Sequence, residues 1–229
     1  MTRSGTQLYL AIAIGLSSTV VSAVARASEP TSCDEDCPHE YGPIQQVAVS
    51  ELSPESKAIV EDFLAGFSGP TLSGGSVDAR ARAGRSRVLL LSIFAEWCCN
   101  CRMEAPELVQ LTQTWGRHGF AVIGRSEYSA PIEVRRHVRE FGVSWPVVLG
   151  SRNPDPENQD RVRTTTAHHR LSRLFGSERK WSTPYNVLVV DGDFDTLYVA
   201  DGEYEPGALE EFLAEHLDTA PEPPAADAP

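Results

Sequence analysis

The chain has 229 residues, which is enough for one ordinary domain with short appendages. Its composition, with 41% hydrophobic and 23% charged residues, is that of a globular protein and excludes a collagen-like or coiled-coil protein. The net charge of −12 argues against nucleic-acid binding, because proteins that neutralise phosphates need an excess of basic residues.

An export signal is predicted in residues 1–27. Arg3 supplies a positive charge, residues 8–24 are apolar and uncharged, and the triplet Ala-Arg-Ala at 25–27 fits the A-x-A cleavage pattern. We therefore predict cleavage after Ala27 and a periplasmic location. The alternative is a retained N-terminal membrane anchor that leaves the protein facing the periplasm, although the apolar run is short for a membrane span.

Residues 28–66 are predicted to form an N-terminal extension, which begins with an acidic segment that holds Cys33 and Cys37. In an oxidising compartment such a pair most often closes a small disulfide, and this is the first expectation. A redox shuttle to the later cysteines is the second. The third is a soft metal such as Cu(I), bound together with His39 in a non-enzymatic copper-binding or copper-delivery module.

The second half of the extension is predicted to be helical. Ser53 is a favourable N-cap residue and is followed by Pro54, which suits the first turn of a helix. Glycine and proline at 69–70 and the glycine pair at 74–75 then indicate a loop or a small hairpin. Residues 80–87 are polar and basic, which indicates a solvated turn.

From residue 88 the pattern becomes regular, and the main domain is predicted to span residues 67–218. The order of strands and helices predicts βαβ crossovers and an α/β fold with a central mixed sheet flanked by helices. The polar segment 150–166 is predicted to be a long loop, and the tail at 219–229 is predicted to be disordered. The predicted elements are a buried strand at 88–94, a helix from 102 to about 115, a strand at 120–124, a helix around 134–141, a strand at 145–149, a short helix at 167–175, a hairpin of strands at 185–190 and 196–200, and a helix around 209–217.

Cys98 and Cys101 form a C-x-x-C pair at the junction between the buried strand and the following helix. At this place the unpaired N–H groups and the dipole of the helix stabilise a thiolate on the first cysteine. The second cysteine follows one helical turn later, within bonding reach. The pattern is typical of thiol–disulfide exchange, with Cys98 as the nucleophile and Cys101 as the resolving cysteine. A structural disulfide is the alternative.

These residues resemble the thioredoxin superfamily over residues 67–217. The resemblance rests on the signature F-A-E-W-C-x-x-C at 94–101, on Pro106 in the first active-site helix, and on Thr183-Pro184 just before a strand. The segment at 101–108 is most similar to exported TlpA/ResA-like disulfide reductases. The chain departs from thioredoxin itself in three respects. Ser92 stands where thioredoxin has a buried acid, the cysteines enclose Cys99-Asn100, and the segment between Trp145 and Pro184 is longer than in a minimal thioredoxin.

The resemblance implies a thioredoxin-like fold and a cis peptide bond at Pro184, whose neighbour Thr183 would offer backbone hydrogen bonds to an extended substrate. Trp97 and Trp181 either form an apolar rim for docking or are simply packed. No metal or other cofactor is implied. The expected partners are dithiols and disulfides of other exported proteins, with apocytochrome c as one candidate, and a membrane thiol–disulfide electron donor. A DsbA-like oxidant or isomerase is the alternative with the same chemistry.

Several polar residues near the motif have simpler interpretations. Cys99 is interpreted as a tolerated substitution at a variable position, with a regulatory third thiol as the alternative. Glu96 or Glu104 would be able to assist proton transfer to the second cysteine, but a solvated surface position is the default. His168 and His169 are adjacent and point in different directions on a helix, so they make a poor pair of metal ligands and are expected to be solvated.

Overall fold

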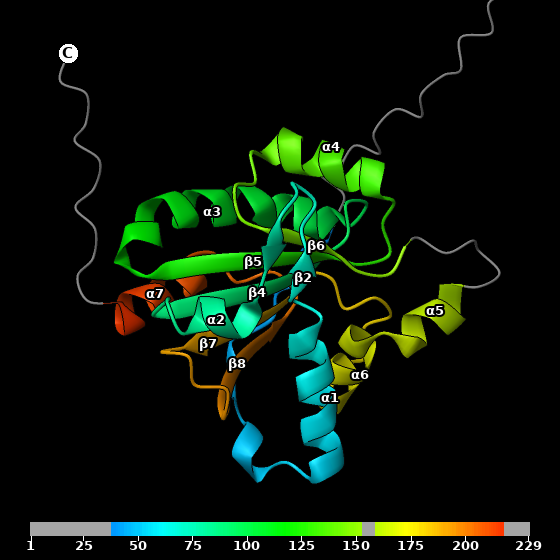
Figure 1. Cartoon of the computed structure of the whole chain (residues 1–229), viewed down its shortest axis with the longest axis vertical. Helices are drawn as coiled ribbons and strands as arrows, with labels where there is room; N and C mark the ends of the chain where they lie inside the picture. The colour runs from blue at the N-terminus through cyan, green and yellow to red at the C-terminus, as the bar shows by residue number, and fades with distance from the viewer. Residues whose placement is uncertain (1–37, 153–158, 218–229) are drawn as a thin grey trace, which may run out of the picture. The chain divides into compact units, whose positions relative to one another are not determined.

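A mixed six-stranded sheet forms the centre of the molecule (Figure 1). The structure, a computed structural model, describes residues 38–152 and 159–217. The strands lie in the order β1-β8-β7-β4-β5-β6, with β4, β5 and β6 parallel to one another and the remaining pairs antiparallel. The strands are β1 (Gln45–Ala48), β4 (Val88–Phe94), β5 (Phe120–Ser126), β6 (Val147–Leu149), β7 (Tyr185–Val190) and β8 (Thr196–Asp201), and a separate hairpin joins β2 (Gly69–Pro70) to β3 (Ser76–Val77).

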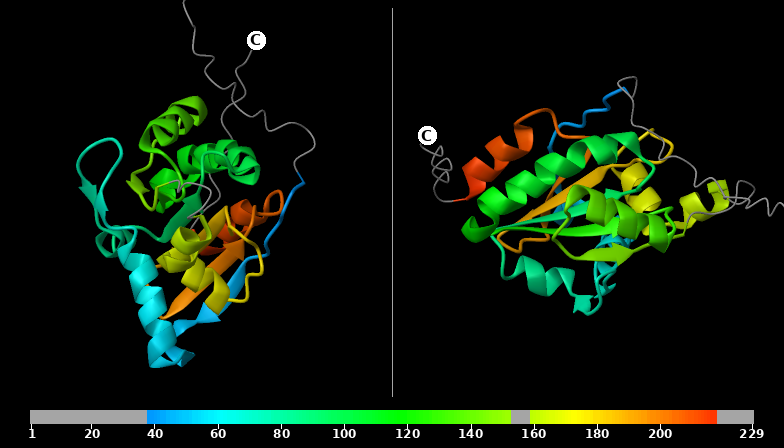
Figure 2. Two further views of the ribbon diagram at one scale, coloured as in Figure 1. Left: turned by 90° about the vertical axis from the view of Figure 1, so that its right-hand side faces the viewer. Right: turned by 90° about the horizontal axis from the view of Figure 1, so that it is seen from above.

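Helices cover both faces of the sheet (Figure 2). On one face lie α1 (Pro54–Ala65), α2 (Ala79–Ala83) and α6 (Ala167–Leu174), and on the other lie α3 (Cys99–Trp115) and α7 (Ala208–His216). The remaining helices are α4 (Pro131–Phe141), α5 (Gln159–Thr165) and the short 3-10 turns η1 (Val49–Glu51) and η2 (Gly116–His118). In the part of the chain that the structure describes, no helix combines the length and the apolar character needed to cross a membrane.

The two faces of β4 explain its unbroken apolar sequence. Alternate side chains of a strand point to opposite faces, so Leu89 and Leu91 pack toward α1 and α6. Val88 and Leu90 pack toward α3 and α7. All seven residues of β4 are buried, as expected for a strand covered on both sides. The predicted α/β fold with a mixed sheet between helices is therefore confirmed.

The N-terminal part of the described chain is built into this domain. β1 pairs antiparallel with β8, with Gln45 opposite Val199. Phe63 of α1 lies in the same core as the central strands. The predicted division at residue 67 had placed these elements in a separate extension, and β1 was not predicted at all. The predicted signal at 1–27 and the predicted tail at 219–229 lie outside the described residues.

Two segments predicted as loops contain helices. In the predicted basic turn at 80–87, Asp78 caps α2, since its Oδ1 accepts the Ala81 N–H at 2.8 Å, and both Ala79 and Ala83 are buried. In the predicted loop at 150–166, α5 forms from residue 159. Both predictions were wrong because a short helix with few apolar residues leaves little periodicity to detect.

Other local signals were interpreted correctly. Ser53 caps α1 through its Oγ, which accepts the Ser56 N–H at 3.2 Å, and Pro54 is the first helical residue. At the tip of the β7–β8 hairpin, Asp191 and Gly192 both have positive φ, at 50° and 72°. That conformation is the one that Asp-Gly favours at a hairpin turn.

Candidate functional site

The C-x-x-C motif lies where β4 leaves the sheet and α3 begins. Cys98 is the N-cap residue of α3, and its Sγ accepts the backbone N–H of Cys101 at 3.3 Å. The helix therefore starts three residues earlier than predicted, at Cys99. Because the free N–H groups of the first helical turn surround this sulfur, a negative charge on Cys98 is stabilised.

The loop before β7 supplies the opposite wall of the site. The peptide bond between Thr183 and Pro184 is cis, the conformation expected from the sequence. The Cys98 thiol lies 3.2 Å from the carbonyl oxygen of Thr183, to which it donates. This same oxygen accepts a hydrogen bond from Arg179 at 3.0 Å. The structure thus brings together the cysteine pair and the predicted cis-proline, which are more than 80 residues apart in the chain.

Cys98 and Cys101 differ in their ionisation. The pKa of Cys98 is lowered by the hydrogen bond with the Cys101 thiol, by the Cys101 N–H, and by its contacts with Thr183 and the charge of Arg179, although burial opposes these effects. The pKa of Cys101 is raised well above its ordinary value, first by burial and then by Cys98 and the nearby Glu104. Cys98 is therefore the better nucleophile of the two.

Glu104 is buried beside the cysteine pair and is only 4% exposed. Its Oε1 accepts a hydrogen bond from the Asn186 amide of β7 at 2.7 Å. Burial raises the pKa of Glu104 well above its ordinary value. The prediction of a solvated Glu104 was wrong, because this face of α3 packs against the sheet. Glu96, by contrast, remains partly exposed, near the Ser129 side chain.

A groove of about 340 Å³ opens over Cys98. Trp97 is 40% exposed at its edge, and its Nε1 donates to the carbonyl oxygen of Tyr128 at 3.2 Å. The ring of Trp181 meets the Trp97 ring edge to face, with centroids 5.5 Å apart. The groove is lined by Glu40, residues 97–100 and residues 179–183. The two tryptophans therefore lie in contact with each other in the groove that Cys98 lines.

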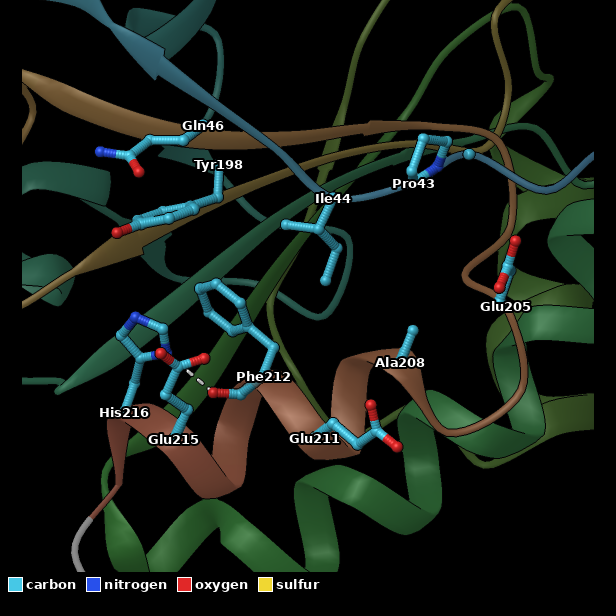
Figure 3. Close-up of a pocket in the computed structure, with 11 residues that line it drawn as sticks. Pro43, Ile44, Gln46, Tyr198, Glu205, Ala208, Glu211, Phe212, Glu215 and His216 are labelled. Atoms are coloured by element: carbon cyan, nitrogen blue, oxygen red, sulfur yellow. Dashed lines mark hydrogen bonds between the residues drawn. The ribbon is translucent and has the colours of Figure 1, made fainter.

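A larger pocket of about 530 Å³ lies elsewhere, between β1, β8 and α7 (Figure 3). Its lining includes three carboxylates, from Glu205, Glu211 and Glu215, together with aromatic rings such as Tyr198. None of the described residues that line it is a cysteine. We place the candidate site at the smaller groove, because that groove contains the group able to react.

Cys99 is disulfide-bonded, whereas Cys98 and Cys101 are free thiols. The interpretation of Cys99 as a merely tolerated substitution does not fit this bond. Its partner is not among the described cysteines, and the only other cysteines of the chain are Cys33 and Cys37. The predicted disulfide between those two lies outside the described residues. A bond from Cys99 to either of them would exclude it.

The alternative of copper binding depends on Cys33 and Cys37, which lie outside the described residues. Of its proposed ligands only His39 is described, and its Nδ1 lies 3.2 Å from Glu203 Oε2. Among residues 38–152 and 159–217, no group of three His, Cys, Asp or Glu side chains is arranged to hold a metal ion.

Two functional candidates were missed in the sequence. Arg179 reaches both the Thr183 carbonyl and Asp201, the latter at 3.1 Å, but a single arginine in a polar segment carries no local signal. His168 was expected on the surface and is instead 2% exposed, with its Nε2 2.8 Å from the carbonyl oxygen of Ser182. That prediction was wrong because the inner face of α6 packs against the sheet. His169, its neighbour, is partly exposed.

Comparisons with known proteins complete this description. No model of a protein family matches the chain, and no curated protein matches it. Among solved structures, it is similar to a thiol:disulfide interchange protein of the thioredoxin family from Chlorobium tepidum, with 17% identity over 79% of this chain and 98% of that one, at a TM-score of 0.49. It is also similar to a secreted disulfide oxidoreductase from Mycobacterium tuberculosis, with 17% identity, 67% and 98% coverage and a TM-score of 0.47. A putative thioredoxin from Neisseria meningitidis shows 21% identity, 65% and 85% coverage and a TM-score of 0.47.

Proposed function

We propose that this protein is a thiol–disulfide oxidoreductase that reduces disulfides of other exported proteins. The observation that carries the proposal is the position of Cys98. It is a free thiol at the N-terminus of α3, with Cys101 one turn further on and the backbone before a cis-proline 3.2 Å away. A structural disulfide would not need a sulfur with a lowered pKa beside an open groove.

The first chemical step is attack by the Cys98 thiolate on one sulfur of a substrate disulfide. A Cys98–substrate S–S bond forms, the substrate S–S bond breaks, and the released substrate thiolate takes a proton from solvent. The N–H groups at the start of α3 stabilise the attacking thiolate before the reaction. Trp97 and the backbone of Thr183 and Pro184 are proposed to bind the substrate chain on either side of the sulfur.

In the second step the Cys101 thiol loses its proton and attacks the sulfur of Cys98. The mixed disulfide breaks, a Cys98–Cys101 bond forms, and the second substrate thiolate leaves and is protonated. Two electrons have then passed from the protein to the substrate. Glu104 is a carboxyl group whose charge acts on Cys101, and in its carboxylate form we propose it as the acceptor of the Cys101 proton.

The oxidised protein must be reduced again before the next cycle. We propose a membrane thiol–disulfide carrier as the electron donor, and apocytochrome c cysteines as one class of substrate, from the resemblance to TlpA/ResA-like reductases. Export, with removal of residues 1–27 after Ala27, is part of the proposal. No cofactor is needed, since sulfur carries both electrons.

Mixed-disulfide trapping tests the proposed function. In a Cys101→Ser variant the first step proceeds and the second cannot, so substrates remain covalently bound to Cys98. Cys98→Ser is the matched control and should trap nothing. If Cys98→Ser traps partners as well as Cys101→Ser does, or if neither variant traps any, the assignment of roles is wrong.

A redox titration of the Cys98–Cys101 pair against glutathione tests the direction of electron flow. A potential near or below about −270 mV supports a reductase. A value near about −120 mV would instead support the DsbA-like oxidant, with the same two cysteines running in the opposite direction.

A further inference from the structure

His168 is a buried histidine that the chemistry above does not use. It belongs to α6, and both of its ring nitrogens have partners. Its Nε2 lies 2.8 Å from the carbonyl oxygen of Ser182, and its Nδ1 lies 3.3 Å from the hydroxyl of Tyr128. Ser182 directly precedes the Thr183–Pro184 pair, so the ring contacts the main chain of the groove.

The partners of His168 determine which nitrogen carries the proton. A carbonyl oxygen can only accept, so Nε2 must donate to Ser182. Burial lowers the pKa of His168 to about 4, so the ring is neutral near pH 7 and its Nδ1 accepts. Burial also raises the pKa of Tyr128 to about 12, so that its hydroxyl keeps the proton it donates to Nδ1. The two hydrogen bonds therefore fix a single tautomer.

The main chain that His168 holds has an unusual conformation. Ser182 has a φ of 46°, in the left-handed region that residues other than glycine seldom adopt. Its side chain is tied as well, since its Oγ lies 2.7 Å from the Oγ of Ser177. A backbone of this kind persists only where its surroundings impose it. The next residue is Thr183, whose carbonyl oxygen accepts a hydrogen bond from the Cys98 thiol.

The same network reaches the opposite wall of the groove. Tyr128 accepts the indole N–H of Trp97 through its carbonyl oxygen, at 3.2 Å, and its ring lies against Trp181, with centroids 5.0 Å apart. Tyr128 and His168 thus connect the loop that carries Trp97 to the loop that carries the cis-proline. The hydrogen bond between the Tyr128 hydroxyl and His168 links the two walls of the groove, and the same hydroxyl lies 3.2 Å from the hydroxyl of Thr166.

We infer that His168 is a positioning residue for disulfide exchange, which holds the Ser182 carbonyl and so keeps the backbone at Thr183 and Pro184 in the shape that receives an extended substrate chain. The inference rests on the proposed function. It also gives a role to the segment between β6 and β7, because α6 supplies this histidine.

Two probes test the inference. Insulin is a protein disulfide, reduced in the steady state with dithiothreitol as the electron donor, and 5,5′-dithiobis(2-nitrobenzoic acid) is a small disulfide, reduced in a single turnover by the prereduced protein. His168→Leu removes both hydrogen bonds and should raise the KM for insulin by about fivefold to tenfold, since a buried carbonyl loses its donor. Its rate with the small reagent, which binds no extended backbone, should change by less than about twofold. His168→Gln restores a hydrogen-bond donor and should therefore have a KM for insulin close to that of the wild type.

The control is His169→Leu, which should behave as the wild type with both probes. Equal losses with both probes and no recovery in His168→Gln would overturn the inference, as would an unchanged KM in His168→Leu. Wild-type protein that reduces neither probe would refute the proposed function itself. Nitrogen-15 NMR of the wild-type ring is independent of any variant. It should show a proton on Nε2 and none on Nδ1, and the opposite tautomer or a charged ring near pH 7 would also overturn the inference.

Discussion

Cys98 and Cys101 lie one helical turn apart in α3 and have opposite surroundings. Cys98 lines the groove, where the thiol and the N–H of Cys101, the Thr183 side chain and the charge of Arg179 lower its pKa. Both sulfurs border the same apolar cluster, but Cys101 is the more deeply buried and has Glu104 nearby. The environment of the first thiol favours its charged form, and that of the second favours its neutral form.

This contrast shows how two identical side chains would acquire the two roles proposed for them. In the proposed reaction the first thiol is ionised and accessible before it meets a substrate, whereas the second stays protonated until the mixed disulfide has formed. A negative charge on Cys101 in the free protein would repel the Cys98 thiolate and so oppose the ionisation of Cys98. The difference comes from position: Cys98 caps the N-terminus of α3 and lines the groove, whereas Cys101 lies inside the first turn and is only 3% exposed.

The largest expected effect is in alkylation. Iodoacetamide at pH 7 should modify Cys98 at least about 100-fold faster than Cys101, because only the former combines a lowered pKa with access from the groove. Tandem mass spectrometry of the tryptic peptide locates the label. In a Cys98→Ser variant the remaining Cys101 should stay slow. Comparable alkylation rates for the two thiols would show that Cys98 and Cys101 do not differ in ionisation and access.

Glu104→Gln should change how stability depends on pH. The folded pKa of Glu104 lies above its ordinary value of 4.5, so between these two values the native state holds a proton that the unfolded state has lost. The wild type therefore loses stability as pH rises through this window, by at most about 1.4 kcal/mol per pH unit. Gln keeps the hydrogen bond to Asn186 and does not titrate.

Thermal unfolding of both proteins from pH 4 to pH 8 measures this difference. Glu104→Gln should match the wild type near pH 4 and be the more stable protein at higher pH. Glu107→Gln is the matched control, since Glu107 lies on the same helix, is less buried and should show a weaker trend. Parallel curves for wild type and Glu104→Gln would mean that this carboxyl is not the buried acid described here.

Cys99→Ser tests whether the disulfide beside the pair affects it. Because Cys99 is not one of the two thiols of the proposed exchange reaction, the exchange rate of Cys98 should change by less than about threefold in this variant. Non-reducing peptide mapping of the wild type should find Cys99 joined to Cys33 or Cys37. A map that joins Cys33 to Cys37 and leaves Cys99 free would instead restore the pairing expected from the sequence.

The smallest effect is expected for Arg179→Gln. Loss of this charge should bring the pKa of Cys98 closer to its ordinary value and slow its alkylation at pH 7 by about twofold, since the arginine is already paired with Asp201. High salt should shrink the difference. Arg80→Gln removes an equal charge outside the groove and should have no effect.

The core of the fold follows from local patterns in the sequence. β4 is a continuous apolar run, and the helix after it shows apolar residues at spacings of three and four, so both elements and the Cys98–Cys101 motif between them were predicted. β1 was not, because its four residues include Gln45 and Gln46 and its pairing with β8 depends on contacts more than 140 residues away. A local sequence pattern carries no information about pairing between strands so far apart in the chain.

Some residues of the candidate site were predicted from the sequence, and others became apparent only in the structure. The cysteines and Pro184 have a recognisable spacing, whereas the burial of Glu104 and His168 depends on what packs over them. A glutamate on an amphipathic helix and a histidine in a polar segment are most often exposed. Only the tertiary structure shows that Asn186 of β7 lies against Glu104 and that the carbonyl of Ser182 lies against His168.

Asn100, between the two cysteines, has a consequence for redox engineering. Its amide donates to the carbonyl of Pro38 at 3.1 Å and to Glu203 Oε1, and so anchors the chain that leads into β1. Exchanging the dipeptide Cys99-Asn100 for Gly-Pro, with the aim of resetting the potential, would also detach that leading segment from the active-site helix. A substitution at Asn100 would therefore act on the residue between the two cysteines and on the attachment of the segment before β1 at the same time.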